Sequence, residues 1–364
     1  MSFTPVFDHG RPLDPNDKYL ILWATMSEPV ADFSPLRVKR VVRETSDAVS
    51  LVLDVPRHCS GRFRYQAGQF LTLRVNLDGQ ELRRCYSMSS APVEEELRIT
   101  VKRDPGGLVS NWLNDTVSEG AEIHAAPPEG RFLLRDTDSE IVAFAGGSGI
   151  TPIMSLIRTA LATSARSIRL FYANRNRGSV IFADDLARLV EHNADRLVLT
   201  HHYDDDSGVV TPAAIESFVA GAGDADFYIC GPGPFMDTVE GALATRGAPR
   251  DRVHLERFQV AQVPAGADAS EAQATEEIVI ELDRKTTTVP YRSGNTLLQT
   301  ARTAGLRAPS SCETGSCGTC MAQVVSGSAR MLNNDALDDD EVADGWVLTC
   351  QSLPTSRSVH VVYE

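Results

Sequence analysis

The stretch CETGSCGTC at residues 312–320, followed by a last cysteine at Cys350, decides how the end of this chain folds. Its four cysteines are separated by four, two and twenty-nine residues. This is the plant-type spacing in which four thiolates hold a [2Fe–2S] cluster, and small residues between them let backbone N–H groups reach the sulfurs. Zinc is the alternative, but zinc ribbons use two Cys-x-x-Cys knuckles. The predicted ligands are Cys312, Cys317, Cys320 and Cys350.

Length and charge limit the other possibilities. A chain of 364 residues has room for two or three domains. The net charge is −14, but residues 35–135 carry fifteen basic and thirteen acidic side chains, against eleven and seventeen in residues 136–258. A nucleic-acid-binding protein would concentrate basic residues on one face, so we expect no nucleic-acid partner. The mildly basic segment is where bound phosphates are expected.

The remaining cysteines and the absence of long apolar runs suggest a location. Cys59, Cys85 and Cys230 are far apart and form no disulfide framework, which favours a reducing cytoplasm. No apolar run approaches the roughly eighteen residues of a membrane span, and the N-terminus lacks the order of a signal peptide. Residues 1–34 are predicted to be a poorly ordered extension, and an alternative start at Met26 stays open.

The segment after residue 258 divides into a linker and a small domain. Residues 259–277 are rich in alanine, glycine and acids and cannot form a core. A β-hairpin is predicted at 278–291 with its turn at 283–285, then a helix from about Asn295 ended by Gly305, the cysteine loop, and a closing strand at 358–363. These elements predict a compact mixed unit over residues 278–364.

Residues 35–135 read as an antiparallel β-barrel. Apolar residues alternate with polar ones around 51–55, 71–75 and 97–101, the period of half-buried strands. Within the segment lies RRCYSMSS at residues 83–90. Tyr86 would stack on a flavin ring, Ser87 would bond its edge, and Arg84 would take a phosphate. The alternative is ordinary exposed side chains on barrel strands.

Residues 136–258 change to alternating strands and helices, as in a doubly wound parallel sheet. A short apolar strand at 141–145 runs into GGSGITP at residues 146–152, and a helix follows. A glycine-rich turn between a strand and a helix presents N–H groups to a pyrophosphate. The turn is not the G-x-G-x-x-G of Rossmann domains, and no acidic residue follows at the usual distance.

The order of these modules, with their short motifs, resembles the ferredoxin–NADP reductase superfamily. Arg84 to Ser87 resembles its flavin motif Arg-x-Tyr-Ser, residues 146–152 its nicotinamide loop, and Cys230-Gly231-Pro232 its strand-end motif. Residues 172–175, 179–182 and 230–236 are most similar to fused reductases that serve ring hydroxylases, notably those of ketosteroid hydroxylases and phenylacetyl-CoA epoxidases. The implied fold is multidomain α+β: an FAD-binding barrel, an α/β nucleotide-binding domain and a β-grasp ferredoxin domain.

The resemblance also implies residue roles. Cys230 would face the nicotinamide, Ser87 would contact the flavin, and Glu256 with Phe258 would close over it. The remaining residues expected to bind cofactors are Arg84, Tyr86, Lys102, Gly107, Ser110, Gly147, Gly149 and Thr151. Arg175 follows the strand at 168–172, where it would contact the adenosine ribose, and with Arg177 it could bind the 2′-phosphate of NADPH. The reductases that this chain resembles favour NADH, so NADH is the expected nucleotide.

The implied activity is NAD(P)H-dependent electron transfer through FAD and the [2Fe–2S] cluster to an oxygenase component. An FMN-containing reductase of the phthalate-dioxygenase type has the same domain order. A redox-sensing module without NAD(P)H turnover, or an iron–sulfur protein whose cluster is only structural, are the alternatives from other classes.

Three further clusters are interpreted as structural. His201-His202 has no Cys or carboxylate at ligand spacing, and residues 204–206 (DDD) are expected in a solvated loop. The acidic run at residues 338–341 is expected to begin a solvated helix, although docking of a basic partner is the alternative.

Overall fold

The computed structural model describes residues 7–8, 11–12, 33–258, 275–310, 315, 317–334 and 336–363. Two short strands, β1 (Phe7–Asp8) and β2 (Arg11–Pro12), pair antiparallel within the N-terminal extension. Met26 and the remaining residues of the predicted extension up to residue 32 lie outside the described residues, as do most of the predicted linker and Cys312, whereas Ser34 already begins the first barrel strand.

The first domain is an antiparallel sheet of six strands in the order β6-β5-β8-β3-β4-β7. An isolated bridge between Met88 and Ile99 joins the regions of its two edge strands, as barrel closure requires. Alternate residues such as Leu51 and Leu73 are fully buried in its core, and helix α2 (Leu108–Asp115) adds Leu113. The strands are β3 (Ser34–Thr45), β4 (Ala48–Asp54), β5 (Phe70–Leu77), β6 (Gln80–Ser87), β7 (Leu97–Lys102) and β8 (Glu122–Ala125).

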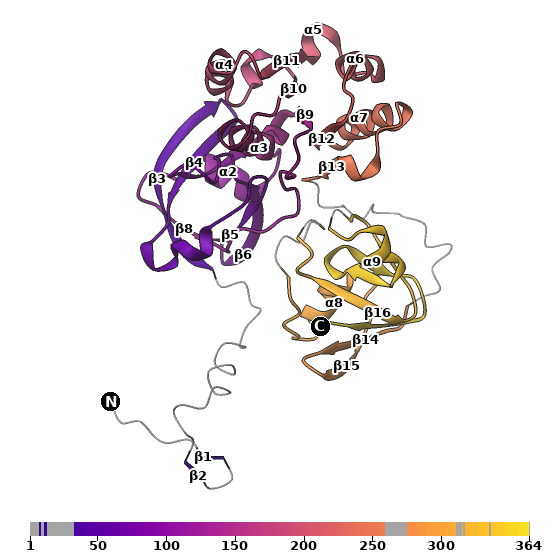
Figure 1. Cartoon of the computed structure of the whole chain (residues 1–364). Helices are drawn as coiled ribbons and strands as arrows, with labels where there is room; N and C mark the ends of the chain where they lie inside the picture. The colour runs from indigo at the N-terminus through magenta and orange to yellow at the C-terminus, as the bar shows by residue number, and fades with distance from the viewer. Residues whose placement is uncertain are drawn as a thin grey trace. The chain divides into compact units, whose positions relative to one another are not determined.

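The second domain is a parallel sheet in the order β11-β10-β9-β12-β13, with helices on both faces (Figure 1). Ile141 and Ala143 of the central strand face one core and Val142 and Phe144 the other, so both faces are apolar. Helices α3 and α4 cover the first face, and α6 and α7 cover the second. The elements are β9 (Glu140–Gly146), α3 (Ile150–Thr163), β10 (Ile168–Asn174), α4 (Ala183–His192), β11 (Leu197–Tyr203), α5 (Asp204–Ser207), α6 (Pro212–Phe218), β12 (Ala225–Cys230), α7 (Gly233–Thr245) and β13 (Val253–Glu256).

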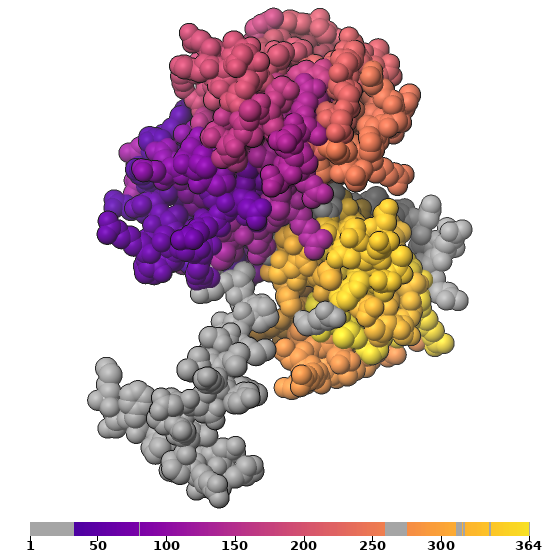
Figure 2. Space-filling model, viewed as in Figure 1, coloured from indigo at the N-terminus to yellow at the C-terminus, as the bar shows by residue number. Residues whose placement is uncertain are grey.

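The third domain is a five-stranded mixed sheet in the order β15-β14-β20-β16-β18, with a two-stranded sheet of β17 and β19. In the space-filling view the described residues from 278 onward form one compact body (Figure 2). The elements are β14 (Glu277–Leu282), β15 (Lys285–Pro290), α8 (Leu297–Thr303), β16 (Met321–Ser326), β17 (Ala329–Met331), α9 (Asp339–Ala343), β18 (Trp346–Leu348), β19 (Ser352–Pro354) and β20 (Ser358–Val362). Barrel, parallel sheet and ferredoxin-like unit confirm the predicted fold class.

Local chemistry explains where these elements begin and end. Thr296 caps α8 through a capping box with Gln299, and Gly305 follows it with φ +76°. The acidic run at residues 338–341 does begin a helix, with Asp338 and Glu341 forming the capping box of α9.

Two sequence predictions were wrong in detail. The acidic run at residues 204–206 forms the short helix α5 rather than a loop, because carboxylates favour the first turn of a helix and Gly208, with φ +72°, ends it. The hairpin turn contains only Asp283 and Arg284, both with positive φ, so Lys285 already belongs to β15. In the part of the chain that the structure covers, no helix is both long and apolar enough to cross a membrane.

Candidate active site

The predicted flavin residues lie together near the end of β6. Tyr86 and Ser87 pair with Leu71 and Phe70 of β5, which fixes their register. Ser87 is buried, and burial raises the pKa of Tyr86, so its hydroxyl stays protonated. Arg84 is exposed, and its guanidinium donates to the carbonyl of Arg83 over 2.7 Å. An aromatic ring, a buried hydroxyl and an exposed guanidinium on one strand suit a flavin with its phosphates.

The predicted pyrophosphate turn caps helix α2. Gly107 is the N-cap residue, and a β-carbon there would lie 2.6 Å from the Ser110 Oγ, so a larger residue would displace the Ser110 side chain. Ser110 Oγ accepts a hydrogen bond from the backbone N–H of Asp104 over 3.1 Å. The hydroxyl of Ser110 therefore helps to shape the turn.

The glycine turn (residues 146–152) is held against the end of β12 by backbone contact. A β-carbon on Gly149 would lie 2.0 Å from the carbonyl oxygen of Cys230, a separation that real atoms do not adopt. Gly147 has φ +53°, and Lys102 Nζ lies 3.5 Å from the position of its missing β-carbon. Thr151 is buried and donates to the carbonyl of Ser148 over 3.0 Å. Lys102, at the end of the barrel strand β7, therefore lies against the glycine turn.

Cys230 and Glu256 end neighbouring parallel strands. They are Cα partners in the pairing of β12 with β13, and both side chains are buried. Phe258 follows two residues later and is 40% exposed. Since ligands of open parallel sheets bind at the carboxyl ends of the strands, the structure places these residues at the expected edge.

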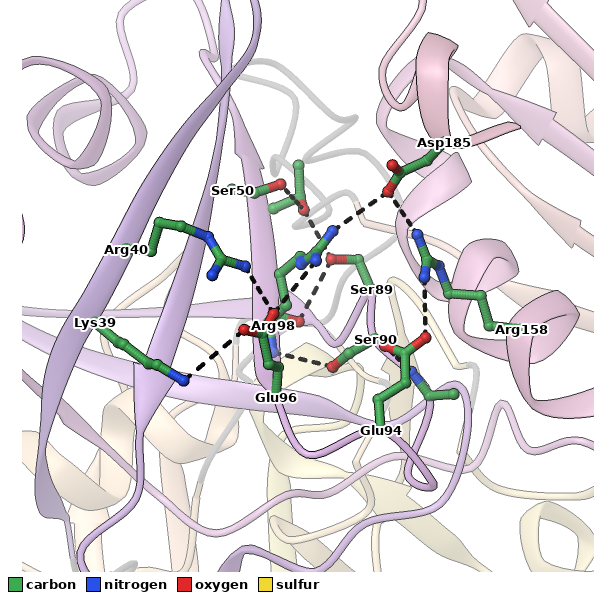
Figure 3. Close-up of polar contacts among 12 residues, drawn as sticks. Lys39, Arg40, Ser50, Ser89, Ser90, Glu94, Glu96, Arg98, Arg158 and Asp185 are labelled. Atoms are coloured by element: carbon green, nitrogen blue, oxygen red, sulfur yellow. Dashed lines mark hydrogen bonds and ion pairs between the residues drawn. The ribbon is translucent and has the colours of Figure 1, made fainter. Parts of the chain in front are cut away.

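Ion pairs join the barrel to the parallel-sheet domain (Figure 3). Arg98 of β7 lies 3.4 Å from Asp185 of α4, and Arg158 of α3 lies 2.5 Å from the same carboxylate. Arg158 also lies 2.9 Å from Glu94, in the loop before β7. These side chains are largely shielded from water, so salt screens their attraction only partly. Sequence analysis missed this network because no local pattern links residues so far apart.

Two arginines after β10, together with Tyr203 and Asp206, form what we call the arginine edge (Arg175, Arg177, Tyr203 and Asp206). Arg175 lies 3.0 Å from Asp47, in the turn between β3 and β4. Arg177 lies 2.8 Å from Asp206 of α5, and its guanidinium sits 4.5 Å from the centroid of the Tyr203 ring. The bond to Asp206 raises the pKa of Arg177. Both arginines have carboxylate partners, which the sequence analysis did not foresee.

The cluster loop is described in part. Cys320 and Cys350 are buried and Cys317 is half-buried. The backbone N–H of Thr319 donates to Cys317 Sγ over 3.4 Å, the kind of bond that a cluster thiolate accepts. The residues that the structure describes, which leave out Cys312, contain no group of three or more His, Cys, Asp or Glu side chains already arranged to hold a metal ion. The three described cysteines and the backbone N–H that donates to Cys317 fit the binding of a [2Fe–2S] cluster.

The remaining cysteines and histidines have local partners. The Cys59 thiol is buried and donates to the carbonyl of Pro56, and Cys85 lies 3.4 Å from the Thr72 hydroxyl. His202 Nε2 lies 2.8 Å from the carbonyl of Gly208. His201 stacks on Tyr203, and burial lowers its pKa.

Comparison with known proteins identifies the three domains. The oxidoreductase FAD-binding domain family matches residues 35–133, the oxidoreductase NAD-binding domain family residues 144–241, and the 2Fe-2S iron-sulfur cluster binding domain family residues 280–355. The fold and these matches define a flavin- and iron–sulfur-containing oxidoreductase that uses FAD, a nicotinamide nucleotide and a [2Fe–2S] cluster.

Whole-chain relatives narrow this class. The chain is 40% identical to the ferredoxin reductase component of 3-ketosteroid-9-alpha-monooxygenase from Mycolicibacterium smegmatis, over 90% of this chain and 96% of the relative. It is 31% identical to one of the subunits of the 1,2-phenylacetyl-CoA epoxidase of Escherichia coli K12, over 91% and 98%. Phthalate dioxygenase reductase has a similar solved structure, with a TM-score of 0.63 and 29% identity over 91% of this chain and 98% of that one. The chain belongs to the ferredoxin–NADP reductase superfamily, in the branch with a C-terminal plant-type ferredoxin domain.

Proposed function

We propose that this protein is the reductase component of a two-component oxygenase and passes electrons from NADH to an oxygenase partner in the cytoplasm. Its relatives are the reductase component of a ketosteroid monooxygenase and a constituent of a phenylacetyl-CoA epoxidase. Cys59, Cys85 and Cys230, which are not among the predicted cluster ligands, are far apart in the sequence and show no disulfide framework, which supports a reducing compartment. We assign residues 35–135, 136–258 and 278–364 to the three domains.

The observation that carries the proposal is the meeting of the glycine turn with Cys230 and Lys102. Gly149 packs on the Cys230 carbonyl, and Lys102 ends the strand beside the flavin strand. Burial lowers the pKa of Lys102, with Asp47 4.0 Å away opposing that shift. When bound, FAD accepts a hydride from the nicotinamide and releases single electrons to the cluster. The chain's part is to hold the nicotinamide against the flavin: Gly147, Gly149 and Thr151 shape the turn, Tyr86 and Ser87 line the flavin, and Cys230 and Glu256 face the reacting end.

Anaerobic mixing of the holoprotein with NADH tests this function. We expect the flavin absorbance to bleach first and the cluster absorbance to follow within the same turnover. A redox-sensing module without nucleotide turnover would leave the flavin oxidised. Reconstitution with candidate oxygenases, followed by product formation, then identifies the partner, and an NADH-reduced protein that supports none of them would refute the oxygenase assignment.

The arginine edge supports NADH as the nucleotide. A 2′-phosphate carries negative charge and needs a cation that is free to pair with it. Here Arg175 pairs with Asp47 and Arg177 with Asp206, while helix α5 adds two more carboxylates. NADPH would have to displace a carboxylate from an arginine and then face the acidic helix. We therefore assign the pairs as a device that disfavours the 2′-phosphate.

A further inference from the structure

The hydroxyl of Tyr363 is a buried polar group that makes no hydrogen bond of ordinary distance and angle with any described residue, although Thr349 lies beside it. Tyr363 is 6% exposed, and its oxygen has no hydrogen-bond partner within the part of the chain that the structure covers. Its backbone is fixed, because its N–H donates to the carbonyl of Glu281 over 2.9 Å. Leaving a buried hydroxyl unpaired costs free energy, so such a group needs an explanation.

The ring of Tyr363 belongs to the same core as two of the predicted cluster ligands. Cys320 and Cys350 are both part of the hydrophobic cluster that contains Tyr363. The strand pairing explains why: Gln323 of β16 is opposite Val362 of β20, so Tyr363 follows at the end of β16 where Cys320 lies. Val359, Val361 and Tyr363 alternate as the buried side of their strand.

The neighbouring hydroxyl of Thr349 already donates its proton in a hydrogen bond, and no hydrogen bond of ordinary distance and angle joins it to Tyr363. Thr349 donates its hydroxyl proton to the carbonyl of Cys320 over 2.8 Å, and its backbone N–H donates to the same oxygen over 3.1 Å. The groups that act electrostatically on the Tyr363 hydroxyl are Thr349, Cys320, Cys350 and, most weakly, Arg302. A tyrosine phenol has an ordinary pKa of about 10, so it keeps its proton at neutral pH and can donate it in a hydrogen bond.

We propose that the Tyr363 hydroxyl donates a hydrogen bond to the sulfur atoms on the Cys320–Cys350 side of the [2Fe–2S] cluster and thereby raises its reduction potential. Reduction adds negative charge to the cluster, and a hydrogen bond to sulfur stabilises the reduced form more than the oxidised form. Tyr363 is thus a positioning and tuning residue for electron exit, outside the four cysteines.

The test is a mediated redox titration of the cluster in the full-length holoprotein, with dithionite as reductant, so that neither NADH nor an oxygenase partner is involved. We expect Tyr363→Phe to lower the equilibrium constant for one-electron reduction of the cluster about threefold to tenfold. At 59 mV per decade this is a fall of roughly 30–60 mV in midpoint potential. Tyr291→Phe is the matched control: its hydroxyl donates to the carbonyl of Asn295 in the same domain, and its loss should leave the potential unchanged.

A second substitution keeps the test decisive if Tyr363→Phe fails to retain its cluster. Replacing Tyr363 with 3-fluorotyrosine changes one ring atom, keeps the hydroxyl and makes it a stronger donor. The potential should then rise, with iron and sulfide contents equal to those of the wild type. An unchanged potential in either cluster-loaded variant would overturn the proposal, because a purely structural tyrosine would not move it.

Discussion

At the glycine turn the backbone of Gly149 packs directly against the backbone of Cys230, whereas at the arginine edge the contacts are ion pairs between exposed side chains. Gly149 leaves no room for a single carbon against Cys230, while Arg175 and Arg177 are about two-thirds exposed. The first arrangement cannot change without moving two strands of the sheet. The second depends on exposed ion pairs, which contribute little to stability and can be exchanged. Hydride transfer needs fixed geometry and nucleotide preference needs only a balance of charge, and these two sites, which follow the neighbouring parallel strands β9 and β10 at the same edge of the sheet, are built accordingly.

Gly149→Ala should disrupt the glycine turn and give the largest effect. The added methyl group has no space, so the glycine turn must move away from Cys230. A displacement of about 1 Å at a reacting centre can cost on the order of a hundredfold in rate. We expect that loss in kcat/KM for NADH, measured by ferricyanide reduction.

Gly241→Ala is the control for that change. Gly241 lies within α7 with open space around its α-carbon, so alanine there should leave activity unchanged and stabilise the helix slightly. If Gly149→Ala kept wild-type kcat/KM, the backbone contact would not position the nicotinamide.

Asp206→Asn should change the nucleotide preference set by the arginine edge without disturbing the glycine turn. Freed from its carboxylate, Arg177 can pair with a 2′-phosphate. Because the pair is exposed, we expect a modest change, with the ratio of kcat/KM for NADPH to that for NADH rising about two- to fivefold. Initial rates with both nucleotides measure it.

Two further variants serve as controls for this change in nucleotide preference. Asp195→Asn removes an exposed carboxylate just before β11, at its other end, and should leave the ratio unchanged. Arg177→Ala in the Asp206→Asn background should reverse the gain. If Asp206→Asn raised the rates with both nucleotides equally, the edge would not read the 2′-phosphate.

The smallest expected effect is on the pH dependence of stability and comes from His254, which belongs to neither the glycine turn nor the arginine edge. His254 packs on Tyr228 with ring centroids 4.9 Å apart, and burial, with help from Arg135, lowers its pKa. As the pH falls below its ordinary value of 6.5, the unfolded chain binds a proton that the folded chain resists, so stability should decrease. Asp226, whose pKa is also lowered, affects stability only at lower pH.

Thermal unfolding midpoints between about pH 7.5 and 5.5 measure this dependence. His254→Phe should reduce the slope and leave the part that comes from His201, whose pKa burial also lowers, whereas the exposed His192→Gln should leave the slope unchanged. Equal slopes in both variants would mean that His254 titrates as it does in the unfolded chain.

The sequence predicted much of the fold because its signals are local. The glycine turn, the alternating barrel strands and the cysteine spacing each depend on neighbouring residues, and the strand β9, the helix α3 and the order of the domains followed from them. The carboxylate partner of Arg175 could not be predicted, because Asp47 lies 128 residues earlier in the chain, in the barrel, and only the packing of the barrel against the parallel-sheet domain brings the two together. The loop prediction at residues 204–206 is wrong because a run of acidic residues suits the first turn of a helix as well as a solvated loop. The roles assigned to Cys230, Ser87, Glu256 and the other site residues stay predictions.

The central claim is that electrons enter at the glycine turn and leave through the cluster, and Cys317→Ser in the full-length protein tests it most directly. Ferricyanide accepts electrons from the flavin, while cytochrome c needs the one-electron exit of the cluster. NADH-dependent reduction of the two acceptors should therefore separate: the variant keeps the ferricyanide rate of the wild type and of the control Cys59→Ser, but loses cytochrome c reduction. Cytochrome c reduction at the wild-type rate, in a variant shown to have lost its iron, would contradict the account.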